Sequence, residues 1–92
     1  MGAGLIAVSA LAAPIDEAKR MYRDGDYSGA VAQLRKILKS KPKDGTANYY
    51  LGASLMALGE TAQARGPLEK AEERGVADAS RLLVVNALDE YR

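Results

Sequence analysis

The sequence predicts an all-α protein, a stack of two helix pairs followed by one closing helix. Two observations lead to this fold class. The stretch Ala47–Ala71 carries apolar residues at helical spacing on both sides of the turn Leu58–Glu60, as expected for two amphipathic helices folded back on each other. A looser copy of the pattern occurs 34 residues earlier, over Ala18–Leu38, and a half-length copy starts near Ala79.

Composition and length indicate one small domain of closely packed helices. A chain of 92 residues buries a modest core, which suits a repeat stack, and alanine and leucine supply most of its apolar residues. The absence of Cys excludes disulfides and thiol nucleophiles, and the absence of His removes the commonest general base. A formal net charge of +1 gives no reason to expect a nucleic-acid partner.

Residues 1–13 are apolar and uncharged, and we expect a leader segment there, separate from a repeat domain at 14–92. The run is too short to span a bilayer, so no membrane span is predicted. Its end, Ala10-Leu11-Ala12, supplies the small residues that signal peptidase requires before a cut. No basic residue precedes the run, which leaves an extra helix packed on the first repeat as the alternative. The leader predicts an exported protein, in the bacterial periplasm; the alternative is a cytoplasmic one.

The first helix pair is expected over Ile15–Asp24 and Tyr27–Lys39. Gly25 can adopt the left-handed conformation that ends a helix, and Asp26 can cap the N-terminus of the next one. The connection at 40–44 contains a proline, which cannot continue the second helix.

The second pair is expected over Gly45–Leu58 and Ala62–Arg74. Asp44 can cap the first of these helices, Gly59 can end it, and Thr61 can cap its partner.

The closing helix is expected over Ala79–Tyr91, after a break at Gly75 and with Asp78 as its cap. It is apolar on more than one face, through Leu82, Leu83, Val84, Val85 and Leu88. Such a face usually marks an interface. We therefore expect either that the chain is part of a longer protein or that it self-associates through this helix.

The spacing resembles that of the tetratricopeptide repeat, a 34-residue helix pair with a Leu-Gly…Ala…Pro skeleton. In the second repeat the matching residues are Leu51, Gly52, Leu55, Gly59, Ala64, Leu68 and Ala71. In the first they are Ala18, Met21, Gly25, Tyr27, Ala30, Leu34, Ile37, Leu38 and Pro42. Asn48 stands where the family has Trp, and Val76 stands where it has the closing proline. The resemblance implies a right-handed α-α superhelix with a concave groove.

The resemblance also implies which residues line that groove, those on the first helix of each repeat. The expected partner-binding residues are Lys19, Tyr22, Arg23, Tyr49, Ala53 and Met56. Tyr and Met offer apolar contact, and the two cations would attract acidic groups. The alternative is that the aromatic and Met side chains are ordinary packing between repeats. Members that grip chaperone tails use Lys and Asn at set positions, occupied here by Lys19, Tyr50, Ala53, Ser80 and Val84, so that clamp is not reproduced.

No residue pattern nominates a catalytic, metal or cofactor site. The acidic pairs Asp24/Asp26 and Glu72/Glu73 fall at helix ends, where caps and surface charge explain them better than catalysis. The basic run at 39–43 reads as a solvated turn rather than a phosphate loop, since it lacks a glycine cradle. The predicted function is a non-catalytic protein–protein interaction module that binds a peptide or partner protein. The alternative is a structural spacer in a larger, exported protein.

Overall fold

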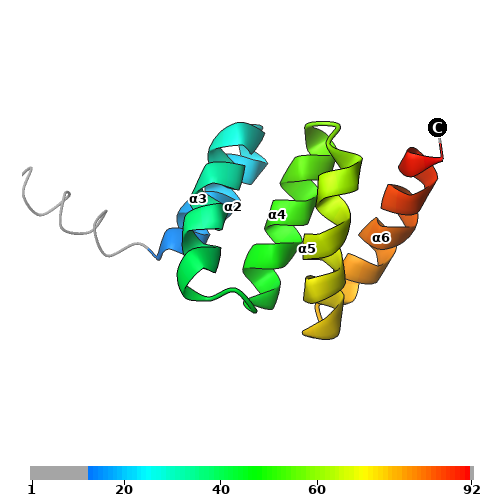
Figure 1. Ribbon diagram of the computed structural model, residues 1–92. Coiled ribbons are helices and arrows are strands. Elements are labelled where there is room, and N and C mark those ends of the chain that lie inside the picture. Colours follow the sequence, from blue (N-terminus) through cyan, green and yellow to red (C-terminus); the bar gives the residue numbers. More distant parts are fainter. Residues whose placement is uncertain (1–12, 92) are drawn as a thin grey trace, which may run out of the picture.

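The computed structural model describes residues 13–91, which form five helices and no strand (Figure 1). The helices are α2 (Pro14–Arg23), α3 (Tyr27–Ser40), α4 (Gly45–Ala57), α5 (Thr61–Glu73) and α6 (Ala77–Glu90). They follow one another along the stack in chain order. The predicted all-α fold, two helix pairs plus a closing helix, is confirmed. The predicted leader falls almost entirely on residues 1–12, outside the described part of the chain.

Three tight turns share one backbone geometry. Gly25, Gly59 and Gly75 have φ of 84°, 81° and 84°, the left-handed region that favours glycine. In each turn the residue after the glycine donates its N–H to a carbonyl five residues back, as Asp26 does to Met21 at 2.9 Å. The next helix starts immediately after that residue in all three cases, so the glycine position sets the start of α3, α5 and α6.

Two of the four predicted helix caps are confirmed. The Asp26 carboxylate accepts the Gly29 N–H at 3.0 Å, and the Asp44 carboxylate accepts the Ala47 N–H at 2.9 Å. The predictions for Thr61 and Asp78 are wrong, because both residues already lie within the first turn of their helices. The shared turn places Glu60 and Val76 at the cap position instead, and neither makes a side-chain cap hydrogen bond. The closing helix therefore begins two residues before its expected start.

Small residues let the helices of a pair approach closely. Ala18, Ala30 and Ala64 are fully buried. At Gly52 on α4, a Cβ atom would lie 2.5 Å from Cγ of the buried Leu68 on α5, closer than packed carbons allow. The Gly52 backbone is thus in direct contact with the α5 side chain, which explains the Leu-Gly pair in the sequence.

Two buried asparagines tie the helices to the turns. The Asn48 side chain donates to the carbonyls of Pro42 at 3.1 Å and Asp44 at 2.9 Å, which anchors the connection between α3 and α4. The Asn86 side chain on α6 donates to the Thr61 carbonyl at 2.6 Å. Asn48 is 2% exposed, so the position that the sequence analysis singled out as a departure holds a satisfied buried amide.

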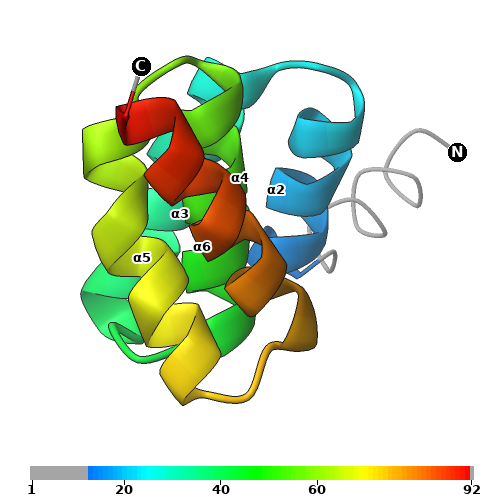
Figure 2. The same ribbon diagram turned by 90° about the vertical axis from the view of Figure 1, so that its right-hand side faces the viewer.

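The helices form two layers (Figures 1 and 2). The first helix of each pair makes the inner layer, in which α4 contacts both α2 and α6. The second helices, α3 and α5, make the outer layer. None of the described helices combines the length and apolar character needed to cross a membrane. The surface formed by α2, α4 and α6 is therefore the inner face of the stack.

Candidate functional site

Four tyrosines from three helices meet in one cluster. The Tyr22 ring on α2 makes edge-on contacts with Tyr27 of α3 and Tyr50 of α4, each with 5.5 Å between ring centroids. Tyr50 in turn meets Tyr49 edge-on at 5.2 Å. Edge-to-face pairs of this kind stabilise aromatic clusters beyond their area of burial. All four side chains are only half-buried, so the cluster also presents aromatic surface to solvent.

Cations from α2 border this tyrosine cluster. The Lys19 ammonium lies 5.8 Å from the centroid of the Tyr50 ring, within the range of a cation–π contact. Arg23 is exposed and makes no ion pair with any described residue, whereas the intervening Arg20 is paired with Glu17 and Asp24. Lys19 and Arg23 are thus the α2 cations available to an incoming acidic group.

The phenol groups of the cluster sit in a partly desolvated environment. Burial raises the pKa of Tyr22, and the neighbouring Tyr27 and Tyr50 add to the rise. Burial also raises the pKa of Tyr49, with a further contribution from the charge of Asp78 on α6. The ring contacts join α2, α3 and α4 in one cluster.

The six predicted partner-binding residues differ in what they expose. Tyr22, Tyr49 and Met56 are half-buried and pack against the core, so they both support the fold and retain surface. Lys19 is half-buried over the cluster and Arg23 is exposed. Ala53 is 4% exposed and offers almost no side-chain surface.

Sequence reasoning did not select Tyr50 as a contact residue, although its ring touches Tyr22, Tyr49 and Lys19. Tyr50 was considered only at a position of the chaperone-tail clamp, and Tyr49, its neighbour on the same helix, was predicted as the contact residue instead. Neighbouring helix positions point about 100° apart, so Tyr49 can turn toward α6 while Tyr50 turns toward α2. The contact between Tyr50 and Tyr22 joins two helix pairs, so spacing along α4 alone does not reveal it.

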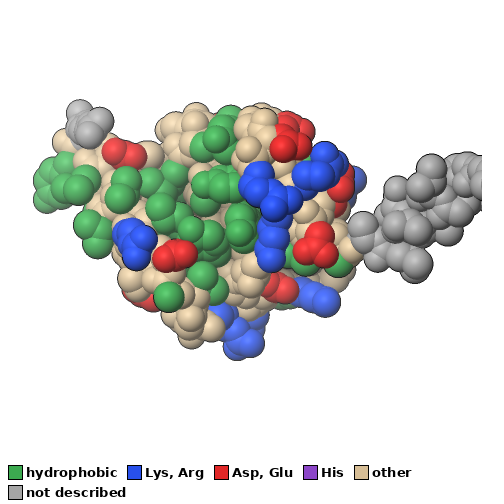
Figure 3. Space-filling view, turned by 180° about the vertical axis from the view of Figure 1, so that it is seen from behind, with side chains coloured by type: hydrophobic (Ala, Val, Ile, Leu, Met, Phe, Trp, Pro, Cys, Tyr) green, Lys and Arg blue, Asp and Glu red, His purple; other side chains and the backbone are tan. Residues whose placement is uncertain are grey.

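The face of the stack seen from behind in Figure 3 carries a broad apolar surface. Figure 3 shows hydrophobic side chains spreading from the α6 end into the middle of this face, with Lys and Arg gathered toward the α2 end. Half-buried residues of α6, Leu82 and Leu83, pack against the same core and continue the apolar surface beyond α4. The face therefore combines an apolar strip with a cationic end.

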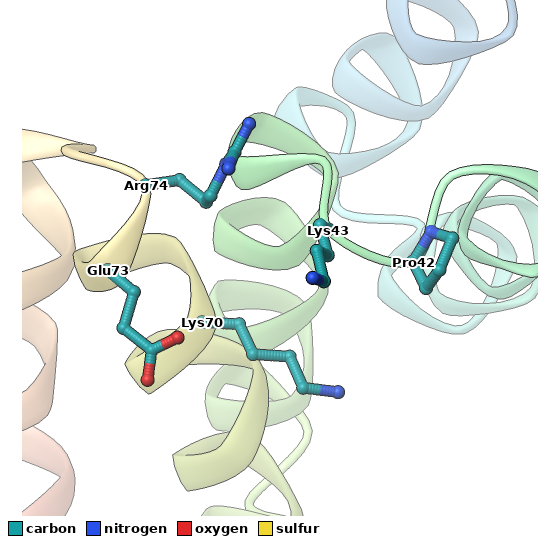
Figure 4. Close-up of a pocket in the computed structure, with 5 residues that line it drawn as sticks. All are labelled: Pro42, Lys43, Lys70, Glu73 and Arg74. Atoms are coloured by element: carbon teal, nitrogen blue, oxygen red, sulfur yellow. The ribbon is translucent and has the colours of Figure 1, made fainter.

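A hollow of about 400 Å³ lies between the α3–α4 connection and the end of α5 (Figure 4). Its lining residues are Pro42, Lys43, Lys70, Glu73 and Arg74. Figure 4 shows Lys43 and Lys70 entering the same space while the Glu73 carboxylate points away from both. The cations are exposed, and the Asp44 carboxylate already occupies the start of α4. This arrangement favours the solvated turn over a phosphate loop.

The part of the chain that the structure describes contains no group of three or more acidic, His or Cys residues placed to hold a metal ion. The acidic residues Asp24 and Asp26 lie at the first glycine turn, where Asp26 acts as a cap and Asp24 pairs with Arg20.

Comparison with known proteins gives one match. A family model described as tetratricopeptide repeat matches residues 21–84, from within α2 to within α6. No curated protein matches the chain, and no solved structure matches it. The resemblance drawn from the Leu-Gly pair, the small residues and the turn glycines is confirmed by this match.

Proposed function

Because the chain belongs to the tetratricopeptide repeat family, whose repeats generally mediate protein–protein interaction, we propose that it binds a segment of another protein in the groove formed by α2, α4 and α6. The observation that carries this proposal is the tyrosine cluster of Tyr22, Tyr27, Tyr49 and Tyr50, which joins two helix pairs and keeps part of its aromatic surface exposed. Binding is non-catalytic, with the ligand held and released unchanged.

The groove favours a ligand with apolar residues followed by acidic ones. Aromatic and Met side chains give large contact area at modest entropic cost and adapt to different shapes, so Tyr22, Tyr49 and Met56 suit apolar anchors. Lys19 and Arg23 at the α2 end suit carboxylates. Charges at the edge of an interface act mainly on the association rate and its salt dependence. We therefore expect affinity to come from the tyrosines and orientation from the cations.

The test starts from peptides selected by the folded chain from a random display library. For a selected peptide, Tyr49→Ala is expected to raise the dissociation constant by about tenfold, equivalent to about 1.4 kcal/mol. Lys19→Ala is expected to have a smaller effect that disappears at high salt. Isothermal titration calorimetry at two salt concentrations measures both, and circular dichroism establishes that each variant is folded.

The matched control lies on the outer layer. Arg35 on α3 is exposed, and its guanidinium donates to the Gln63 side chain on α5 at 3.3 Å. Arg35→Ala removes a cation without touching the groove and should bind the peptide like the wild type. Equal binding by folded Tyr49→Ala and wild type would contradict the groove assignment and favour the structural spacer, whose helices only extend a larger assembly. Unfolding of Tyr49→Ala would place Tyr49 in the core and would equally refute its role as a contact.

We also propose that the protein is exported and that the apolar N-terminal residues are removed. The support is the uncharged run that ends in Ala10-Leu11-Ala12. Mass spectrometry of the protein purified from its native host should find a mature chain that starts at Ala13. A mature product that retains Met1 would contradict export by this route.

A further inference from the structure

One side of α6 is an exposed stripe that no described residue covers. Figure 2 views the stack from this end, with α6 in front. The stripe consists of Ala77, Arg81, Val84, Leu88 and Tyr91, all of them exposed. Val84 is 62% exposed and Leu88 61%, which is unusual for large aliphatic side chains at neighbouring positions of one helix face.

The stripe has the spacing of a helix–helix seam. Its members are separated by four, three, four and three residues, the heptad pattern that keeps side chains on one line of a helix facing a partner helix. The buried residues of α6, Ala79 and Asn86, fall on the opposite side of the helix and pack toward α5. The stripe therefore points away from the rest of the stack, in the direction where a further helix would pack.

We propose that this stripe pairs with the same stripe of a second copy of the chain, with the two α6 helices antiparallel about a two-fold axis. In such a pair, residues whose numbers sum to 172 lie opposite each other. Val84 of each copy then meets Leu88 of the other, and Arg81 meets Tyr91. Val85 and Ala87 flank the seam on its two sides. A two-fold interface needs a surface that is complementary to itself. The stripe meets this condition, because its apolar residues face apolar residues in the antiparallel register.

Charge selects the antiparallel orientation over the parallel one. A parallel pair would place Arg81 against Arg81 and so bury two like charges in the seam. Arg81 makes an exposed ion pair with Asp78 of its own helix at 3.8 Å, and the antiparallel pair would bring its guanidinium within reach of a cation–π contact with a Tyr91 ring. Antiparallel helices also bring the positive end of one helix dipole beside the negative end of the other.

The pairing is expected to be weak and concentration-dependent. An interface made by one 14-residue helix per copy buries less surface than the standard protein–protein interface, which buries about 1,200–2,000 Å² in total. We expect dissociation constants in the range of about 10–500 µM. Sedimentation velocity of the full chain across that range should show a monomer–dimer equilibrium.

Two variants and one mixture test the register. Leu88→Glu and Val84→Lys each put a charge against an apolar side chain of the second copy, so each alone should raise the dimer dissociation constant by about tenfold or more. In an equimolar mixture, Lys at position 84 of one chain faces Glu at position 88 of the other. The remaining contact is the native Leu88–Val84 pair. The mixture should therefore form a heterodimer when neither variant dimerises.

Leu58→Glu is the matched control, because Leu58 is 41% exposed but lies in the turn between α4 and α5. It should dimerise like the wild type, and both single variants should keep the wild-type helicity. A wild-type chain that stays monomeric through the whole range overturns the proposal. So does association that Leu88→Glu leaves unchanged, which would indicate another surface. Failure of the mixture to associate overturns the antiparallel pairing.

Discussion

Gly52 shows how a single missing side chain sets the distance between two helices. Gly52→Ala would force a methyl group to within 2.5 Å of Leu68 Cγ, and Leu68 is fully buried and cannot swing into solvent. We expect the free energy of unfolding to fall by about 1–3 kcal/mol, the usual cost of overpacking a core. Urea denaturation of the two proteins measures this difference.

Gly66→Ala is the matched control for that substitution. Gly66 is also a glycine inside a helix, but apart from its chain neighbours a Cβ there would meet nothing within 4 Å. Its stability should stay close to that of the wild type, because the helix preference of alanine over glycine, about 1 kcal/mol, is offset by the crowding of a side chain that precedes Pro67. If Gly52→Ala were as stable as Gly66→Ala, the close approach of α4 and α5 would not be the reason for the glycine.

The tyrosine cluster predicts a loss of stability in alkali. Burial raises the pKa of Tyr22 and Tyr49 above the ordinary value of 10.0, so the folded state holds their protons more tightly than the unfolded state does. Their contribution is complete below about pH 10 and is lost as the pH rises through the raised folded values. Between pH 9 and pH 11, the urea midpoint of unfolding should therefore fall more in the wild type than in the Tyr22→Phe/Tyr49→Phe variant. An equal fall in both proteins would contradict this account.

At the scale of the helix, N-termini with and without a side-chain cap should lose different amounts of stability when their Asp residue is replaced. Asp44→Ala removes a side chain that accepts the Ala47 N–H and should lower the free energy of unfolding by about 1 kcal/mol. Asp78 lies in the first turn of α6 without capping it and makes an exposed ion pair with Arg81 at 3.8 Å, so Asp78→Ala loses a weakly paired surface charge near the positive helix end, about 0.5 kcal/mol. Thermal unfolding of both variants compares them. A larger cost for Asp78→Ala would mean that it caps α6 after all.

The helices could be predicted from the sequence to within one or two residues, because each is limited by a glycine or by the proline connection. What could not be predicted is which polar residue becomes the cap. Asp and Thr have intrinsic cap preference, and on that basis Thr61 and Asp78 were expected to cap. The left-handed glycine turn decides otherwise, because its hydrogen bonds fix the cap at the residue after the glycine, whatever its type. Asp26 satisfies both conditions, whereas Val76 satisfies only the geometric one.

At the scale of the whole molecule, the 34-residue pattern predicts the stack and the helices that face inward. The side chains that line the groove depend on finer detail. Tyr22 and Tyr49 were predicted as contacts, and both keep exposed surface. Ala53 was predicted as well, but it is buried, with only 4% of its surface exposed. Tyr50 was missed because contact between helix pairs is a tertiary property that spacing along one helix does not reveal.

The stack has two distinct apolar surfaces, and each suits a different kind of binding partner. The groove carries aromatic rings and cations, which suits a foreign segment with acidic residues. The α6 stripe carries aliphatic residues in heptad spacing, which suits a second helix of the same kind. Because the stripe faces away from α5, a dimer through α6 leaves Tyr22 and Lys19 on α2 accessible. Dimerisation would place two grooves in one particle and raise the avidity for a partner with two binding segments.

The central claim is that a partner segment occupies the face of α2, α4 and α6. The measurement that tests it most directly is the set of amide chemical-shift changes in the labelled chain when a selected peptide is added. The account predicts the largest changes on α2 and α4, around Lys19, Tyr22 and Tyr49, with little change on the exposed positions of α3 around Arg35. Changes concentrated on α3 and α5, with the tyrosine cluster unaffected, would contradict it.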